Sequence, residues 1–461
     1  MNIAEVLKRA DDLIFAKTGE HLDYLQEAIL QGTFQGQTYG KIAEATHSSE
    51  GHVRDIGADL WKILSEGFGE EITKKNFRAI IEKVEFNNFS SATVKGNVTV
   101  NNVNLCPKRT RSPTNPQNTE QTPKQPHIDL GDAPEIFRFY NCIPQLTTLK
   151  NSILQDSCRL IALLGISGIG KTTLSLQLIN QIKTQFDYVI YRSLRFSPTL
   201  DTTLINLLQI FSPQTEIPPN IDRKISQSLD YLRQYRCLIV FDDVQMLFSS
   251  GKPAGEYKSE CADYQLFFKL IAEVSHQSCT ILNSWEKPRE IARLEKEDRT
   301  VRSFVLGGLG VAAKDILHSH KLSDEERWSN LIDIYQGNPL WLDLTANLIR
   351  ELFGGRVAEF LQLEMPILDE TLQFHLSQEF QRLTQPELAV MLHLSTQSQP
   401  LPLSQFLNQI QLPASVVVNG VQSLRNRFLL DEIASEIKAE KITLFSLNPV
   451  WKQYVKNYYS S

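Results

Sequence analysis

The clearest hydrophobic pattern in the chain lies between residues 160 and 182. Residues 160–164 (LIALL) are all apolar, as in a buried strand, and apolar residues then recur at helical spacing at Leu174, Leu178 and Ile182. Between these two segments, residues 165–172 (GISGIGKT) fit G-x-x-x-x-G-K-[ST] at every fixed position. A strand, a glycine loop and a helix in this order predict a phosphate-binding loop.

Further apolar segments repeat this alternation of strand and helix. Strands are predicted at 188–194, 237–241 and 279–283, and helices at 200–210, 222–234 and 257–274. The alternation predicts a multidomain α/β protein with a parallel sheet, whose ligand lies at the carboxyl ends of the strands.

Residue chemistry at these strand ends favours a nucleotide with Mg²⁺. Lys171 is expected to reach the β- and γ-phosphates, and the Thr172 hydroxyl to hold Mg²⁺. Asp242 and Asp243 follow the apolar CLIVF strand, where Asp242 would orient the Mg²⁺ shell and Asp243 could polarise water. Asp243 is also compatible with a solvated loop residue or a helix cap. The expected nucleotide contacts in the loop are Gly165, Ser167, Gly168, Ile169, Gly170, Lys171, Thr172 and Thr173.

The N-terminal residues 1–85 have the pattern of a small all-α domain. Amphipathic helices are predicted at 3–16 and 21–30, and helices at 38–45 and 49–65 have helix-turn-helix spacing with a turn at His47-Ser48. The last helix is expected to bury Val53, Ile56, Leu60 and Leu64. Its exposed start carries both acidic and basic residues, and acidic residues outnumber basic ones over the domain, which favours protein interaction over DNA binding.

The remaining segments define the predicted domain order. Residues 86–106 suggest a small β-hairpin, and residues 107–127, rich in Pro, Thr, Asn and Gln, a flexible linker. Residues 311–355 are predicted to be helical around a Gly-Asn-Pro-Leu turn at 337–340, and residues 370–459 have three helices followed by two strand segments, 428–431 and 442–447, as in a winged helix. The predicted domains are helix-turn-helix (1–85), hairpin and linker (86–130), P-loop nucleotide-binding domain (131–303), helical domain (304–366) and winged-helix domain (367–461).

Composition narrows the function classes. The net charge of −6 over 461 residues argues against bulk electrostatic attraction to nucleic acid or to anionic membranes. Six scattered cysteines without C-x-x-C fit a reducing, cytoplasmic environment better than disulfides or a zinc site. Charged residues interrupt the N-terminus before a signal-type apolar core could form, and no apolar run approaches the length of a membrane span.

The ordered set of segments resembles a known family. The P-loop, YVIYRSLR, CLIVFDD, CTILNSWEKP, VRSFVLGGL, YQGNPLWL and the winged-helix pattern are together similar to the NB-ARC ATPases, in the STAND class of signal-transduction NTPases, in their cyanobacterial form. Residues 1–84 resemble the N-terminal helix-turn-helix domain of vWA/MoxR-associated proteins. The resemblance covers nearly the whole chain except the linker.

This resemblance implies a molecular switch that ADP holds closed and ATP opens, with self-association and activation of an effector. It implies that the phosphate loop and Asp242-Asp243 bind phosphates and Mg²⁺, and that Pro339 lies beside the base. Tyr140 belongs to an aromatic pair at the entry to the nucleotide domain. The family usually carries C-terminal repeats, so we expect either a separate sensor protein or a shortened member.

Three positions depart from the family pattern. Asn141-Cys142 stand where Gly-Arg is usual, and Trp285 stands where many relatives have an arginine that senses the γ-phosphate. Asn448 replaces the histidine of the Met-His-Asp position, so it could hydrogen-bond a phosphate but cannot titrate. Arg192 and Arg195, after the second strand, are the candidates to supply the missing charge.

Three functions remain open on the sequence. The first is an ADP/ATP switch with slow hydrolysis, in bacterial stress or phage defence. The second is a nucleotide-controlled transcription regulator that binds DNA through residues 38–65, and the third is a scaffold that binds nucleotide tightly and hardly hydrolyses it.

Overall fold

The computed structural model describes residues 22–68 apart from 23, 35–36 and 47–48, residue 73, and residues 125–460 apart from 137, 141, 213–215 and 438–439. The chain forms two compact units, Met1–Pro116 and Gln117–Ser461, which we describe separately. The predicted helix at 3–16, the turn at 47–48, the hairpin at 86–106 and nearly all of the predicted linker lie outside the described residues.

The first unit contains three described helices around a small apolar core. They are α2 (Tyr24–Phe34), α3 (Tyr39–Ala45) and α4 (Glu50–Phe68). Val53, Leu60 and Leu64 of α4 are fully buried, and Ile56 is partly buried against the same core. The periodicity of α4 therefore correctly predicted its buried face, and α3 and α4 have the predicted helix-turn-helix order.

The second unit is built on a six-stranded parallel sheet in the order β1-β3-β4-β5-β2-β6. Strands β2, β4 and β5 are buried throughout, as expected for a sheet covered on both faces, whereas the edge strands β1 and β6 are more exposed. Their bounds are β1 (His127–Asp129), β2 (Leu160–Leu164), β3 (Tyr188–Ser193), β4 (Cys237–Asp242), β5 (Cys279–Ser284) and β6 (Val301–Val305). The predicted α/β fold is confirmed.

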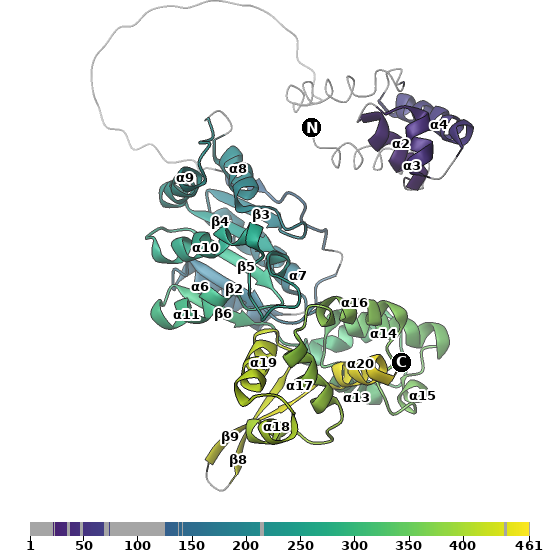
Figure 1. The fold of residues 1–461 in the computed structure, drawn as a ribbon, viewed down its shortest axis with the longest axis vertical. Coiled ribbons are helices and arrows are strands. Elements are labelled where there is room, and N and C mark those ends of the chain that lie inside the picture. The colour runs from purple at the N-terminus through teal and green to yellow at the C-terminus, as the bar shows by residue number, and fades with distance from the viewer. Residues whose placement is uncertain are drawn as a thin grey trace, which may run out of the picture. The chain divides into compact units, whose positions relative to one another are not determined.

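Helices cover both faces of this sheet (Figure 1). One face packs against α6 (Ile143–Leu154) and α7 (Lys171–Ile182). The other packs against α8 (Leu200–Phe211), α9 (Ile221–Gln234), α10 (Asp263–Glu273) and α11 (Arg289–Glu297). Short 3-10 turns complete the domain: η1 (Lys183–Gln185), η2 (Val244–Leu247) and η3 (Ser259–Cys261).

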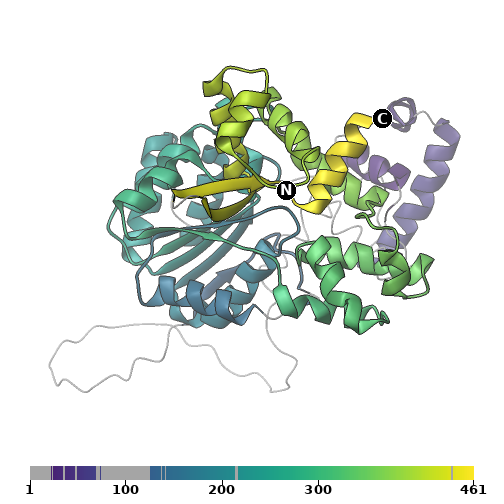
Figure 2. The ribbon, with the colours of Figure 1, turned by 90° about the horizontal axis from the view of Figure 1, so that it is seen from below.

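The C-terminal elements gather at one end of the sheet (Figure 1, Figure 2). The first group of helices and turns is η4 (Gly310–Ala313), α12 (Lys314–Ser319), η5 (Glu325–Arg327), α13 (Trp328–Ile334), α14 (Pro339–Leu352) and α15 (Val357–Leu361). The second group is α16 (Glu370–Phe380), α17 (Gln385–Ser395), β7 (Leu401–Pro402), α18 (Leu403–Gln409), α19 (Ala414–Asn426), β8 (Asp431–Ile437), β9 (Glu440–Ser446) and α20 (Pro449–Ser460). Strands β7, β9 and β8 form an antiparallel sheet, so helices followed by a two-stranded hairpin occur in the predicted order.

Three local predictions were wrong. Strand β1 lies at the end of the segment predicted as linker, so the sheet begins before Gly131. Strand β6 was not predicted, and β8 begins at Asp431, where the predicted strand segment ended. In the part of the chain that the structure describes, no helix combines the length and apolarity needed to cross a bilayer.

Candidate nucleotide-binding site

The loop after β2 has a backbone that glycine makes possible. Gly165, Gly168 and Gly170 have φ angles of 140°, 74° and 100°, in a region that other residues rarely adopt. A Cβ atom on Gly168 would lie 2.5 Å from the Cβ of Leu340, so this position is closed to larger residues. Gly170 is the N-cap of α7, which directs the helix N-terminus and its positive dipole end into the loop.

Lys171 and Thr172 stand in the first turn of α7. The Lys171 Nζ donates to the carbonyl oxygens of Gly165 at 2.8 Å and Ile166 at 3.0 Å, so the side chain lies along the inside of the loop. Burial lowers the pKa of Lys171, and neighbouring carboxylates oppose this change. The net pKa of Lys171 is lowered to about 8, and the neighbouring carboxylates are the groups that favour its charged form.

Asp242, at the carboxyl end of β4, is buried beside this lysine and threonine. It accepts hydrogen bonds from the Thr172 hydroxyl and, at 2.7 Å, from the Tyr191 hydroxyl. Burial and the neighbouring Asp243 raise the pKa of Asp242, while the bonds to Thr172 and Tyr191 lower it. A hydroxyl and a carboxylate at one point form the oxygen donor set that Mg²⁺ prefers, so these two residues fit a Mg²⁺ ion.

Asp243 is held in a left-handed conformation, with φ of 58°, directly before η2. Its side chain is one-third exposed and accepts a 2.7 Å hydrogen bond from the Ser193 hydroxyl. Arg195 lies 3.8 Å from the same carboxylate. Asp243 thus keeps access to solvent next to a cation, which suits a group that polarises water.

These groups share one cavity of about 520 Å³. Its lining combines the phosphate loop with the acidic pair, and the residues are Ser167, Gly168, Gly170, Lys171, Thr172, Thr173, Arg195, Asp242, Asp243, Gln245, Met246, Trp285, Leu340, His375 and Gln378. A larger cavity of about 630 Å³ borders the loop at Gly165, Ile166 and Ile169 but contains neither Lys171 nor Asp242. We therefore assign the phosphate chemistry to the smaller cavity.

The Gly-Asn-Pro-Leu turn contacts the phosphate loop directly. Asn338 is fully buried, donates from Nδ2 to the carbonyl of Ser167 at 3.1 Å, and caps α14 with Oδ1. The backbone N–H of Leu340 donates to the carbonyl of Gly168 at 3.3 Å. Pro339, predicted to lie beside the base, is the residue between these two anchors.

Other predicted residues are more loosely connected with this cavity. Tyr140 is half-buried against the apolar core, and the side chain of Ile169 is buried in the same core, so any contact of Ile169 with phosphate would come from its backbone. Asn448 is buried, and its Oδ1 accepts the backbone N–H of Trp451 at 2.8 Å as the cap of α20. The phosphate contact predicted for Asn448 stays a prediction.

Four contributors to the site were not predicted: Tyr191, Ser193, Asn338 and Glu379. Tyr191 and Ser193 lie in the carboxyl half of β3. Because β3 pairs with β4, both residues lie close to the Asp242-Asp243 pair. Asn338 is the second residue of the motif in which only Pro339 was singled out. Glu379 has no local sequence signal, since its partner Ser167 is 212 residues away.

Comparisons with known proteins agree with this geometry. Residues 144–261 match the NB-ARC domain family, and residues 1–84 match the vWA-MoxR associated protein N-terminal HTH family. The predicted resemblance to NB-ARC proteins is confirmed. An uncharacterized WD repeat-containing protein of Nostoc sp. is 35% identical over 350 residues, which are 72% of this chain and 27% of that protein, so this chain spans about a quarter of the relative's length.

Solved structures with a similar arrangement are distant. A Walker-type ATPase of Pyrococcus abyssi is 14% identical, with a TM-score of 0.45 over 69% of this chain and 96% of that chain. The ORC1 protein of Aeropyrum pernix in complex with DNA is 12% identical, with a TM-score of 0.32 over 69% and 93% of the two chains. Domain III of the Thermotoga maritima replication initiation protein DnaA is 16% identical, with a TM-score of 0.29 over 48% and 89%.

The NB-ARC region of this chain carries a P-loop and an acidic pair, and the match supports nucleotide binding by it.

Two arginines were predicted as substitutes for the cations missing at Cys142 and Trp285. Of these, Arg192 forms a bidentate pair with Asp129, both bonds measuring 2.9 Å. Arg195 instead lines the cavity and is about half exposed. Trp285 lines the same cavity and is 9% exposed. Of Arg192 and Arg195, it is therefore Arg195 that faces the candidate site.

Proposed function

We propose that this chain is an ADP/ATP-binding molecular switch with slow ATP hydrolysis. The observation that carries the proposal is the cavity in which Lys171, Thr172 and the Asp242-Asp243 pair meet residues from the C-terminal elements. Such a cavity allows bound nucleotide to influence the C-terminal elements directly, because both contact the same loop.

Each residue of the cavity has a defined part in the proposed reaction. Lys171 and the loop N–H groups would bind phosphate oxygens, and Thr172 with Asp242 would hold Mg²⁺, which would supply positive charge next to the phosphates. Asp243 orients the attacking water from the solvent-accessible side. Arg195 is the cation that stabilises negative charge on the γ-phosphate.

Slow turnover follows from how few cations face the cavity. A cation supplied to the γ-phosphate contributes roughly 10³–10⁵ in rate in related reactions. Here Trp285 occupies the usual sensor position, Cys142 is buried and uncharged at the usual arginine position, and Arg192 is paired with Asp129. Among the described residues that line the cavity, Arg195 is the arginine available for this role, and it is already close to Asp243.

The proposal also covers the role of the N-terminal helix-turn-helix and what the chain does when ATP is bound. Arg54, near the start of α4, pairs with Glu50 at 2.8 Å, so it offers less charge to DNA phosphates. We assign the helix-turn-helix to protein interaction, and the alternative is a nucleotide-controlled transcription regulator that binds DNA through it. Self-association on ATP binding and a separate sensor or effector protein are proposed from the family resemblance.

The proposal is tested by steady-state ATP hydrolysis of the purified chain and of Arg195→Ala. We expect turnover on the order of one ATP per minute or less, and at least a tenfold decrease in Arg195→Ala. ADP should raise the melting temperature of both proteins equally, which controls for folding of the variant. Brisk multiple turnover would favour an ordinary ATPase, and an unchanged rate in the variant would remove Arg195 from the mechanism.

A further inference from the structure

A carboxylate from the C-terminal elements is bound inside the phosphate loop. Glu379 lies in the last turn of α16, and its Oε1 accepts the backbone N–H of Ser167 at 2.9 Å. The Glu379 residue is only 6% exposed. The backbone N–H groups of this loop type serve to bind phosphate oxygens, so a buried acid here uses a donor intended for an anionic ligand.

The charges around Glu379 are those that a phosphate would meet. Burial raises the pKa of Glu379 to about 7, while the Ser167 N–H and the nearby Lys171 oppose this change. The charge of Glu379 in turn raises the pKa of Lys171, which burial lowers overall. Arg427 also favours the charged form of Glu379, and Glu286 opposes it. The carboxylate thus accepts a phosphate-loop N–H and lies near Lys171, the lysine expected to reach the β- and γ-phosphates.

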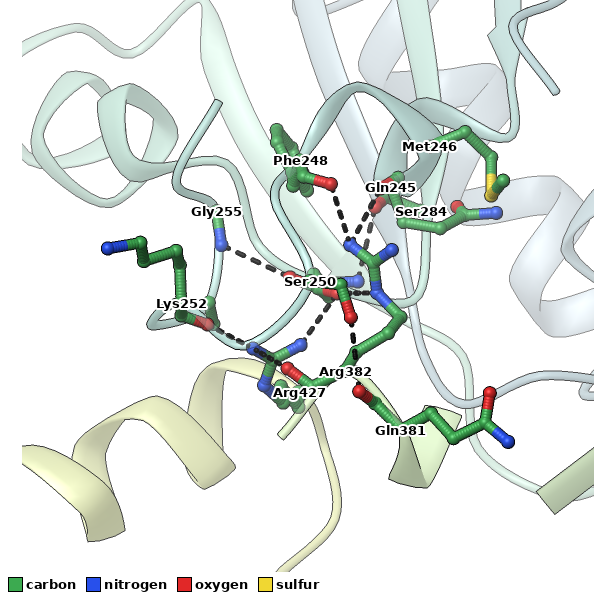
Figure 3. Close-up of polar contacts among 12 residues, drawn as sticks. Gln245, Met246, Phe248, Ser250, Lys252, Gly255, Ser284, Gln381, Arg382 and Arg427 are labelled. Carbon is green, nitrogen blue, oxygen red and sulfur yellow. Dashed lines mark hydrogen bonds and ion pairs between the residues drawn. The ribbon is translucent and has the colours of Figure 1, made fainter. Parts of the chain in front are cut away.

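Glu379 is held there by a buried ionic cluster just beyond its helix. Three residues later, Arg382 pairs with Glu286 at 2.6 Å. It also donates to the carbonyl oxygens of Gln245 and Phe248 (Figure 3). Gln245 and Phe248 follow the acidic pair of β4. One short segment, residues 379–382, therefore contacts the phosphate loop and the segment after the acidic pair at the same time.

The cluster extends to the rest of the C-terminal elements. Arg427, directly after α19, pairs with Glu286 at 2.6 Å and with Glu387 at 2.7 Å. It also donates to the carbonyl oxygen of Lys252 (Figure 3). All of these ionic side chains are 11% exposed or less. These buried pairs fix the position of residues 381–387 next to the end of α16, which carries Glu379.

From these contacts we infer that Glu379 is a selectivity residue of the nucleotide site, which favours a nucleoside diphosphate over a triphosphate by occupying the Ser167 N–H with its own carboxylate. This inference rests on the proposed nucleotide site. A diphosphate needs fewer donors of the loop than a triphosphate. The extra phosphate would have to share one N–H group and one lysine with a carboxylate, and like charges at short range repel strongly where water is excluded.

The experiment compares the affinities of two nucleotides for the full chain. A fluorescent ADP analogue is displaced by ADP and by a non-hydrolysable ATP analogue, in the presence of Mg²⁺, for the wild-type chain and for Glu379→Gln. We expect the ratio of the ATP-analogue Kd to the ADP Kd to fall about tenfold or more in Glu379→Gln, because the amide keeps the size of the side chain and removes its charge. Glu370→Gln, an exposed position at the start of the same helix, is the matched control and should leave the ratio unchanged.

The outcomes separate this inference from the proposed function. An unchanged ratio in a Glu379→Gln protein that still binds ADP would overturn the selectivity role and leave the nucleotide site standing. If the wild-type chain does not bind the fluorescent ADP analogue, both the selectivity role and the proposed nucleotide site are overturned. If Glu379→Gln fails to fold, the same Kd ratio is measured for Glu379→Asp, whose shorter carboxylate keeps the charge but withdraws it from Ser167. Its ratio should fall by less than tenfold, and a ratio equal to that of the wild type would count against the role.

Discussion

At the residue scale, burial also raises the pKa of a carboxyl group outside the nucleotide site, that of Glu290. Glu290 on α11 is 8% exposed, and its Oε1 accepts the Tyr257 hydroxyl at 2.6 Å. Its other oxygen has no hydrogen-bond partner among the described residues. Burial raises the pKa of Glu290 to about 7, from 4.5. The folded state therefore holds this proton more tightly than the unfolded state does.

The sign of the resulting pH dependence follows from linkage. Stability from protonated Glu290 is fully present below pH 4.5 and is lost as the pH rises through 7. Relative to Glu290→Gln, the wild-type free energy of unfolding should thus fall by roughly 3 kcal/mol between pH 4.5 and 7.5. Urea unfolding of both proteins across this range measures the difference. A difference that stays constant with pH would show that Glu290 does not titrate as described.

Single residues of the candidate site could be predicted when their signal was local. The P-loop and Asp242-Asp243 are continuous patterns, and the structure brings them into one cavity. Asn338 and Glu379 contact the loop at sequence separations of 171 and 212 residues. No local pattern encodes such a contact, because it depends on how the C-terminal elements pack against the sheet.

At the element scale, buried ion pairs connect the C-terminal helices with the sheet. In Arg427→Ala, the buried Glu387 loses this cationic partner, and Glu286 loses one of its two arginine partners among the described residues. Removal of one member of a buried pair costs about 3–5 kcal/mol, because the remaining charge stays buried. We expect a decrease of this size in the free energy of unfolding of Arg427→Ala, measured by urea unfolding.

Arg425→Ala is the matched control two residues earlier. Arg425 pairs with Glu432, but their side chains are 50% and 35% exposed. Exposed pairs contribute at most about 1 kcal/mol, so this variant should unfold close to the wild-type midpoint. Equal losses in the two variants would contradict the idea that the buried cluster connects these elements.

The elements that the sequence failed to predict have weak apolar patterns. Strand β1 has three residues, two of them exposed, and β6 has a single buried residue, Val301. The sequence of β8, DEIASEI, is largely polar. By contrast, β2, β4 and β5 are buried throughout, and their continuous apolar runs predicted them well. Strands at the edge of a sheet are thus specified by pairing more than by their own residues.

At the scale of the whole molecule, the fold was predicted mainly from the order of strand and helix segments along the chain. A parallel sheet with a ligand at its carboxyl ends follows from alternating strands and helices, and the fold has that arrangement. The contact between the C-terminal elements and the phosphate loop does not follow from that rule. This contact, through Asn338 and Glu379, is the observation from which we propose a switch rather than a simple ATPase.

The central claim is that Lys171 and the phosphate loop retain an adenine nucleotide. The most direct measurement is to purify the full chain and Lys171→Ala, denature both, and identify the released nucleotide by chromatography. The wild-type chain should release stoichiometric ADP, and Lys171→Ala should release none, because the variant lacks the cation that lies inside the loop. Equal nucleotide content in the two proteins, or none in the wild-type chain, would contradict the account.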